Sequence, residues 1–194
     1  MYLKYLKRIS DCLLSSVATL VISWLLFIII ILIKSTSKGP VFFLQRRIGI
    51  HKREFYILKF RTMRIETPKD MPTHMLVNPE QYITPVGRFL RKTSFDELPQ
   101  LFNIIIGQMA IVGPRPALWN QYDLIEERDK YGANDVRPGL TGWAQVNGRD
   151  EIPIPVKARL DGEYIEKMGF LFDMRCIIKT VSTVLRHEGV KEGV

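Results

Sequence analysis

Two adjacent acids, Asp96 and Glu97, are the residues of this chain best suited to chemistry, because a basic turn precedes them and an apolar stretch follows. If a helix begins near Ser94, both carboxylates lie in its first turn, where unpaired backbone N–H groups and the helix dipole favour negative charge and a bound phosphate. Neighbouring helical residues point about 100° apart, so the pair cannot act as one symmetric clamp. One carboxylate can face a reacting phosphorus atom while the other holds a cation beside it.

The same stretch also has a purely structural interpretation. Ser94 and Glu97 fit the capping box S-x-x-E, and acids are common in a first helical turn because they stabilise it. Pro99 suits the first position of a helix, which also allows a helix that begins nearer Leu98. Taken alone, this stretch favours the structural interpretation.

Cations are predicted on a small β-hairpin that precedes the acids. Residues 41–45 and 55–60 are typical of two short strands around a turn near residues 49–52. Alternation along a strand places Lys59 and Arg61 on the same face. They are either a solvated face of the hairpin or two cations aimed at an anionic site.

Further donors lie in loops after the acids. Arg115 stands between two prolines, which lock the backbone and so present its side chain in a set position. Residues 136–149 combine three glycines with Arg137, Gln145 and Arg149, donors that suit phosphate oxygens or a nucleobase edge. The alternative for this second loop is a solvated, turn-rich connector.

An apolar segment near the start of the chain predicts membrane association. Residues 12–33 include no charged side chain, and these 22 residues would form about 33 Å of helix, enough for a bilayer core. Both flanks are basic, which suits a re-entrant helix–break–helix hairpin, although an ordinary single span remains open. Hydroxyl groups that would satisfy a broken backbone at depth are those of Ser15, Ser16, Thr19 and Ser23.

The fold class is predicted as α+β and mostly α. The 194 residues correspond to a membrane-embedded helical segment, residues 1–38, and a cytoplasmic catalytic domain, residues 39–194, with a short β-hairpin. Apolar residues at three- and four-residue spacing between Phe170 and Leu185 predict an amphipathic helix. Its apolar stripe either packs on the core or lies on the bilayer as an interfacial helix.

The formal net charge of +8 predicts anionic partners. Nucleic acid is not expected, because no recognition motif accompanies the charge. The three histidines and two cysteines form no zinc, Cys/His or Ser/His/Asp pattern, and the nucleotide-binding glycine motifs are missing. Phosphoryl chemistry remains, in which arginines neutralise phosphate oxygens, one carboxylate holds Mg²⁺ and another attacks phosphorus. A membrane anchor implies that one substrate is a lipid.

With these residues in place, the chain resembles the bacterial sugar transferase family, the small monotopic polyprenyl-phosphate phosphoglycosyl transferases, over almost its full length. The resemblance rests on blocks in one order: GPVF at 39–42, KFRTM at 59–63, SFDELPQL at 94–101, VGPRP at 112–116, RPGLTGWAQVNGR at 137–149, and Leu160-Asp161 with Tyr164.

The resemblance implies a two-step reaction with ping-pong kinetics, the first membrane step of bacterial glycoconjugate synthesis. Asp96 would attack the β-phosphate of a UDP-sugar, release UMP and hold the phosphosugar until polyprenyl phosphate, expected to be undecaprenyl phosphate, takes it. Glu97 would hold the Mg²⁺ that bridges the diphosphate. The candidates for substrate binding are Lys59, Arg61, Arg91, Arg115, Arg137, Gln145, Arg149 and Asp161.

One residue departs from the family pattern. The family's membrane helix is usually broken at a Ser-Pro pair, whereas this chain has Ser23-Trp24, so no proline forces a kink. The resemblance and the basic flanks still imply a re-entrant segment in the lipids of the bacterial cytoplasmic membrane, with the catalytic domain on the cytoplasmic face. The sequence defines neither the sugar, nor the pathway, nor the oligomeric state.

Two other functions are consistent with the same sequence features. A non-catalytic membrane-surface protein would use the basic loops to bind anionic lipid or an acidic partner, and charge count would matter more than position. A lipid-phosphate phosphatase working through an aspartyl phosphate would need no nucleotide, and it would release inorganic phosphate instead of UMP.

Overall fold

The computed structural model describes residues 5–67, 79–148 and 152–185. It is a mostly helical α+β protein whose described strands form two small two-stranded sheets. In chain order the elements are α1 (Lys7–Val21), α2 (Ser23–Thr36), β1 (Phe42–Ile48), η2 (Ile50–Lys52), β2 (Glu54–Phe60), η4 (Pro79–Tyr82), α3 (Pro85–Thr93), η5 (Phe95–Glu97), α4 (Gln100–Ile105), β3 (Ala110–Val112), α5 (Tyr122–Asp129), β4 (Gly139–Thr141), η6 (Gln145–Asn147), α6 (Ile154–Lys167) and α7 (Phe170–Leu185).

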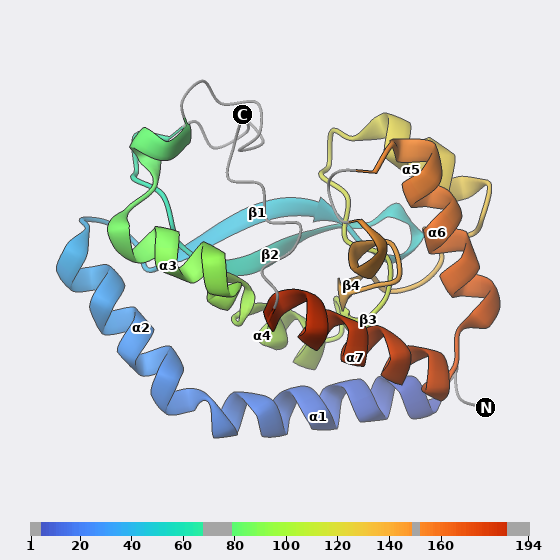
Figure 1. The fold of residues 1–194 in the computed structure, drawn as a ribbon, viewed down its shortest axis with the longest axis horizontal. Helices are drawn as coiled ribbons and strands as arrows, with labels where there is room; N and C mark the ends of the chain where they lie inside the picture. The colour runs from blue at the N-terminus through green and yellow to red at the C-terminus, as the bar shows by residue number, and fades with distance from the viewer. Residues whose placement is uncertain (1–4, 68–78, 149–151, 186–194) are drawn as a thin grey trace.

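The apolar segment forms two helices that meet at a sharp bend (Figure 1). α1 and α2 are inclined by 62° across a break at Ile22, although no proline lies there. The hydroxyls of Ser16 and Thr19 donate to carbonyls four residues earlier within α1, and the hydroxyl of Ser23 donates across the break to the carbonyl of Leu20. The buried hydroxyl of Ser15 has no hydrogen-bond partner among the described residues. No single described helix is long and apolar enough to cross a membrane, but the bent pair together has the required length and composition.

The predicted hairpin is confirmed. β1 and β2 pair antiparallel from Phe42 opposite Phe60 to Ile48 opposite Glu54, so β1 runs three residues beyond its predicted end at residue 45. The hairpin packs one face against α4 through a buried cluster made of Phe55, Ile57, Leu101, Ile104 and Met109. This contact places the end of β2 beside the segment that carries the acids.

A second sheet joins the two donor-rich loops. The three-residue strands β3 and β4 pair in parallel, with Val112 opposite Thr141. The N–H of Gly139 donates to the carbonyl of Pro114 at 2.9 Å, and a Cβ at Gly139 would lie 2.1 Å from the nitrogen of Gly113. Only glycine allows these backbones to approach so closely. The pairing holds the proline-bounded turn that presents Arg115.

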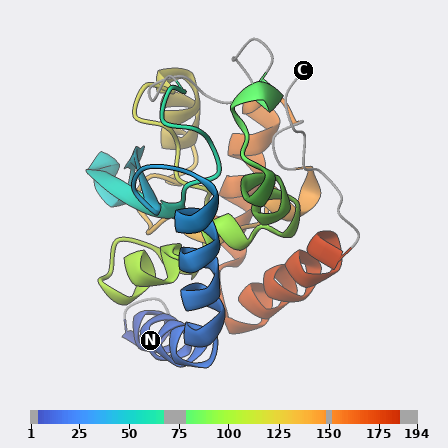
Figure 2. The ribbon, with the colours of Figure 1, turned by 90° about the vertical axis from the view of Figure 1, so that its left-hand side faces the viewer.

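Buried polar contacts attach α1 to the rest of the protein. Lys7 Nζ donates to a carboxylate oxygen of Asp173 on α7 at 2.6 Å, and the hydroxyl of Tyr164 on α6 donates to the same carboxylate at 2.8 Å. Arg8 Nη2 donates to the carbonyl of Ile105 at the end of α4 at 2.7 Å. α1 therefore lies between α4 and α7 as part of the folded body (Figure 2), and α2 packs against α3.

Candidate active site

The acids lie in a tight turn between two helices. α3 ends at Thr93, and Ser94 follows in the left-handed conformation with φ 58° and ψ 18°. Asp96 and Glu97 then occupy the single 3-10 turn η5, and α4 begins only at Gln100. A helical turn does begin after Ser94 with both acids in it, but it is a single 3-10 turn, and the α-helix begins closer to the alternative start near Leu98. The predicted capping box is wrong, because the Ser94 side chain makes no capping hydrogen bond. The left-handed residue reverses the chain and holds both acids between α3 and α4.

Glu97 is held by two cations from different elements. Lys59 Nζ on β2 donates to Glu97 Oε1 at 2.7 Å, and Arg115 Nη2 donates to the same oxygen at 3.1 Å. Burial alone would raise the pKa of Glu97, but Lys59 and Arg115 outweigh it and hold that pKa well below its ordinary value. Glu97 is therefore a permanent anion at physiological pH.

Asp96 is shifted in the opposite direction. Burial raises its pKa above the ordinary value, the positive charge of Lys59 opposes this effect, and the negative charge of Glu97 adds to it. The ion pairs of the described residues join Lys59 and Arg115 to Glu97 and none of them to Asp96. Neighbouring carboxylates whose pKa values are driven apart are suited to different roles in one reaction.

Arg91 also lies beside the acids. It projects from α3 and donates from Nε to the hydroxyl of Thr62 at 3.0 Å, and its charge lowers the pKa of Asp96. α3 comes so close to the chain after β2 that a Cβ at Gly87 would lie 2.0 Å from the carbonyl oxygen of Thr62. The structure thus brings together five predicted residues: Asp96, Glu97, Lys59, Arg91 and Arg115.

Arg61 is placed differently. β2 ends at Phe60, so the strand alternation that predicted a shared face with Lys59 does not continue to Arg61. Its guanidinium donates to the backbone carbonyls of Ser37 and Lys38 and to the Ser37 hydroxyl, the last at 2.7 Å. These contacts tie the end of α2 to the end of β2, and no described contact brings Arg61 to the acid pair.

The glycine-rich loop places its predicted donors elsewhere. Arg137 donates from Nε to the carbonyl of Gly107, just beyond the far end of α4, at 2.9 Å. Gln145 donates to the carbonyl of Leu140 at 3.2 Å, and its buried side-chain oxygen has no partner in the described part of the chain. Neither contacts the acid pair among the described residues, and Arg149 lies outside the described residues.

Asp161 is buried behind the turn that carries Arg115. Its Oδ2 accepts from Arg128 Nε at 2.8 Å, and Arg128 Nη1 donates to the backbone carbonyl of Arg115 at 2.9 Å. Burial raises the pKa of Asp161, and the charge of Arg128 opposes that rise. Arg128 was not among the residues predicted for the site.

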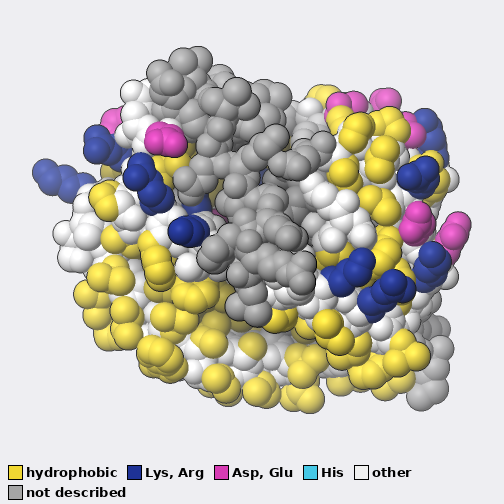
Figure 3. All heavy atoms as spheres, viewed as in Figure 1, with side chains coloured by type: hydrophobic (Ala, Val, Ile, Leu, Met, Phe, Trp, Pro, Cys, Tyr) yellow, Lys and Arg dark blue, Asp and Glu magenta, His cyan; other side chains and the backbone are white. Residues whose placement is uncertain are grey.

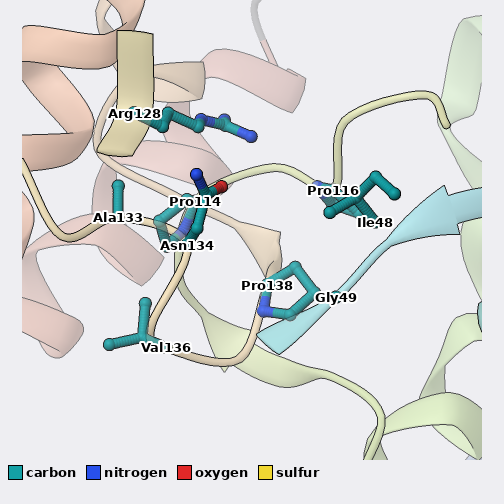
Figure 4. Close-up of a pocket in the computed structure, with 9 residues that line it drawn as sticks. All are labelled: Ile48, Gly49, Pro114, Pro116, Arg128, Ala133, Asn134, Val136 and Pro138. Carbon is teal, nitrogen blue, oxygen red and sulfur yellow. The ribbon is translucent and has the colours of Figure 1, made fainter. Parts of the chain in front are cut away.

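Two small hollows adjoin the turn between residues 114 and 116. The first opens beside Glu97 and is lined by Arg47, Ile57, Lys59, Glu97, Gln100, Arg115 and Pro116. The second shares Pro116 with the first and is bounded by prolines and small side chains, with Arg128 at its edge (Figure 4). The cationic hollow beside Glu97 is the one suited to a phosphate group.

The fold and the site are those of a basic protein with a bent apolar helix pair and two neighbouring acids whose pKa values are shifted in opposite directions. Cations flank these acids, and this arrangement is suited to phosphoryl chemistry. The chain belongs to the bacterial sugar transferase family of enzymes, which matches residues 2–187.

Three relatives illustrate the family. The uncharacterized sugar transferase EpsL of Bacillus subtilis is 37% identical over 187 residues, which are 96% of this chain and 91% of that protein. The UDP-glucose:undecaprenyl-phosphate glucose-1-phosphate transferase of Xanthomonas campestris is 38% identical over 95% of this chain and 40% of that protein. The UDP-N-acetylgalactosamine-undecaprenyl-phosphate N-acetylgalactosaminephosphotransferase of Aeromonas hydrophila is 34% identical over 96% of this chain and 45% of that protein. The chain thus spans less than half the length of the latter two.

Proposed function

We propose that this enzyme transfers a sugar phosphate from a UDP-sugar to polyprenyl phosphate, expected to be undecaprenyl phosphate, and releases UMP. The observation that carries the proposal is that the pKa values of Asp96 and Glu97 are shifted in opposite directions, and that the ion pairs of Lys59 and Arg115 among the described residues go to Glu97. The names of the Xanthomonas and Aeromonas relatives support the choice of substrates, and their different sugars leave the hexose open.

In the first step the carboxylate of Asp96 attacks the β-phosphorus of the UDP-sugar. The bond from this phosphorus to the oxygen that bridges the two phosphates breaks, and UMP leaves with the bonding electrons. In the second step an oxygen of polyprenyl phosphate attacks the same phosphorus, which restores the Asp96 carboxylate and gives the polyprenyl-diphosphate sugar. UMP leaves before the lipid phosphate binds, which gives ping-pong kinetics.

The cations would neutralise the phosphate oxygens around this centre. Lys59 and Arg115 hold Glu97 beside Asp96, and Arg91 adds positive charge from α3. Glu97 fits the role of a Mg²⁺ ligand, because Mg²⁺ is often held by one or two carboxylates together with substrate phosphates. The described residues contain no group of three acidic, histidine or cysteine ligands, so such an ion would be shared with the diphosphate, whose charge it would neutralise.

The exposed apolar surface supports a membrane location. Hydrophobic side chains cover the lower edge of the molecule in the view of Figure 3, along α1 and α2. Exposed apolar residues of α1, α2, α4 with its C-cap, and α7 include Leu13, Val17, Leu20, Trp24, Phe27, Ile31, Phe102, Ile106, Leu171 and Ile178. Apolar surface of this extent is otherwise costly in water. Residues 1–38 would form a re-entrant anchor in the bacterial cytoplasmic membrane, and residues 39–194 the catalytic domain on its cytoplasmic face.

UMP release from a panel of UDP-sugars tests the proposal, using detergent-solubilised protein, Mg²⁺ and undecaprenyl phosphate. We expect one or a few UDP-sugars to release UMP, and Asp96→Asn to abolish the release. Asp123→Asn, which alters an exposed acid in the first turn of α5, is the control and should retain the wild-type rate. Release of inorganic phosphate from the lipid without nucleotide would favour a phosphatase. If a folded wild-type protein releases no UMP from any UDP-sugar of the panel, the surface-binding alternative is favoured.

A further inference from the structure

A buried ion pair lies behind the turn that presents Arg115. Arg128 on α5 is 3% exposed, and Asp161 on α6 is 1% exposed. Burying two charges costs several kcal/mol per ion unless their geometry and hydrogen bonds repay it. A pair this deep therefore calls for a structural explanation, and Asp161 presents almost no surface to solvent.

The two residues divide the donors of Arg128 between two partners. Nε donates to Asp161 Oδ2 at 2.8 Å, and Nη2 lies 2.6 Å from the same oxygen in the ion pair, while Nη1 donates to the carbonyl of Arg115 at 2.9 Å. A guanidinium is planar and rigid, so its hydrogen bond and ion pair with Asp161 set the direction of the Nη1 bond. A lysine ammonium at residue 128 would lack this fork.

The remaining contacts of the turn lie on either side of Arg115. The carbonyl of Pro114 accepts from Gly139, and the carbonyl of Pro116 accepts from Arg47 Nη1, both at 2.9 Å. The bond from Arg128 holds the carbonyl between these two. Without the bond from Arg128, the peptide plane next to the Cα of Arg115 would be free to rotate. The side chain on this Cα places Nη2 3.1 Å from Glu97 Oε1.

We propose that Asp161 and Arg128 are positioning residues that set the place of Arg115 and, through it, of Glu97. This assigns a role to Arg128 and replaces the predicted substrate contact of Asp161 with an indirect one. The relay runs from α6 through α5 to the turn, and it ends on the acid pair. The inference rests on the proposed function only for its kinetic test.

A double-mutant cycle on UMP release tests the relay. We expect Asp161→Asn and Arg128→Lys each to lower kcat/KM by about 10- to 100-fold, as for other residues that orient a functional group. In an Arg115→Ala background, Asp161→Asn should change kcat/KM by less than about twofold, because the residue through which it acts is gone. Glu127→Gln on the same helix removes an exposed pair with Lys130 and should retain the wild-type rate.

Hydrogen exchange gives a readout that needs no activity. Asp161→Asn should speed exchange in the peptide covering residues 113–118 and leave the peptides of α1 unchanged, whereas general destabilisation would speed both. Losses that multiply in the Arg115→Ala background, or unchanged exchange at residues 113–118, would overturn the relay. If wild-type protein releases no UMP, the proposed function fails, and the exchange experiment still decides the positioning role.

Discussion

Asp96 and Glu97 are adjacent in the chain and equally part of one turn, yet their surroundings give them different chemistry. Glu97 receives the direct contacts of Lys59 and Arg115, so it stays ionised and suited to hold a cation. Burial without such a direct contact raises the pKa of Asp96. A more basic carboxylate is the better nucleophile once it is ionised.

The acid limb of the pH profile should therefore report Asp96. Because folded Asp96 binds its proton more tightly than an ordinary aspartate, it loses its charge at a higher pH as the solution is acidified. Glu97 remains charged through that range, since its pKa is shifted downward. We expect kcat/KM for UMP release to fall on acidification at a pH above the ordinary aspartate range.

Removal of Lys59 should move this limb further. The charge of Lys59 opposes the raised pKa of Asp96, so Lys59→Met should shift the acid limb to higher pH in addition to lowering the rate. Lys52→Met, which removes an exposed lysine paired with Asp129, should leave the limb in place. A limb that stays in place in Lys59→Met, or moves to lower pH, would contradict the assignment.

At the scale of elements, the bend between α1 and α2 forms without the proline that usually breaks this helix in the family. Trp24 is the second residue of α2, where backbone N–H groups have no partner within the helix and proline is tolerated. We expect Trp24→Pro to change the free energy of unfolding by about 1 kcal/mol or less and to retain UMP release. Thermal unfolding in detergent measures the effect.

Leu14→Pro is the matched control, because Leu14 is an exposed apolar residue like Trp24 but lies in the interior of α1. A proline in a helix interior costs about 3 kcal/mol or more, so this variant should fold poorly. Equal damage from both substitutions would mean that the bend at Ile22 does not exist in the folded protein.

The hairpin, the apolar helices near the start of the chain and the helix from Phe170 to Leu185 could be predicted because their signals are local. Strand alternation and the turn composition at residues 49–52 suffice for β1 and β2. β3 and β4 have three residues each, too few for a periodic signal, and their parallel pairing depends on close approach at Gly113 and Gly139. The sequence left the start of α4 open between Ser94 and Leu98, because the left-handed conformation of Ser94 is not evident from its residue type.

Part of the candidate site could also be predicted from local sequence patterns. Asp96, Glu97 and Arg115 were identified from motif composition, and the structure brings them together. Arg61 was assigned to a face by an alternation that stops one residue too early. Arg128 was missed because burial of an arginine depends on a partner from another helix, which no local pattern reveals.

At the scale of the whole molecule, α4 and α7 flank the bent pair and place exposed apolar residues beside it. If the bent pair is re-entrant, both of its ends lie on the cytoplasmic face. In a variant lacking Cys12 and Cys176, we expect Tyr5→Cys and Ser35→Cys to react with an impermeant maleimide in inside-out membrane vesicles only.

Val21→Cys, next to the bend, is the control for depth and should be protected in vesicles of either orientation. It is exposed on the protein surface, so protection would come from lipid and not from the fold. Reaction of the two flanking cysteines from opposite sides would establish an ordinary span and contradict the re-entrant anchor.

The covalent intermediate at Asp96 is tested most directly by intact-protein mass spectrometry. The protein is first incubated with the UDP-sugar that supports UMP release, in the absence of polyprenyl phosphate. We expect one sugar phosphate to be added to the protein, located at Asp96 by peptide mapping, removed by hydroxylamine and absent from Asp96→Asn. Addition of the lipid phosphate should discharge it. UMP release only when both substrates are present, with no adduct at any time, would contradict the covalent aspartyl intermediate.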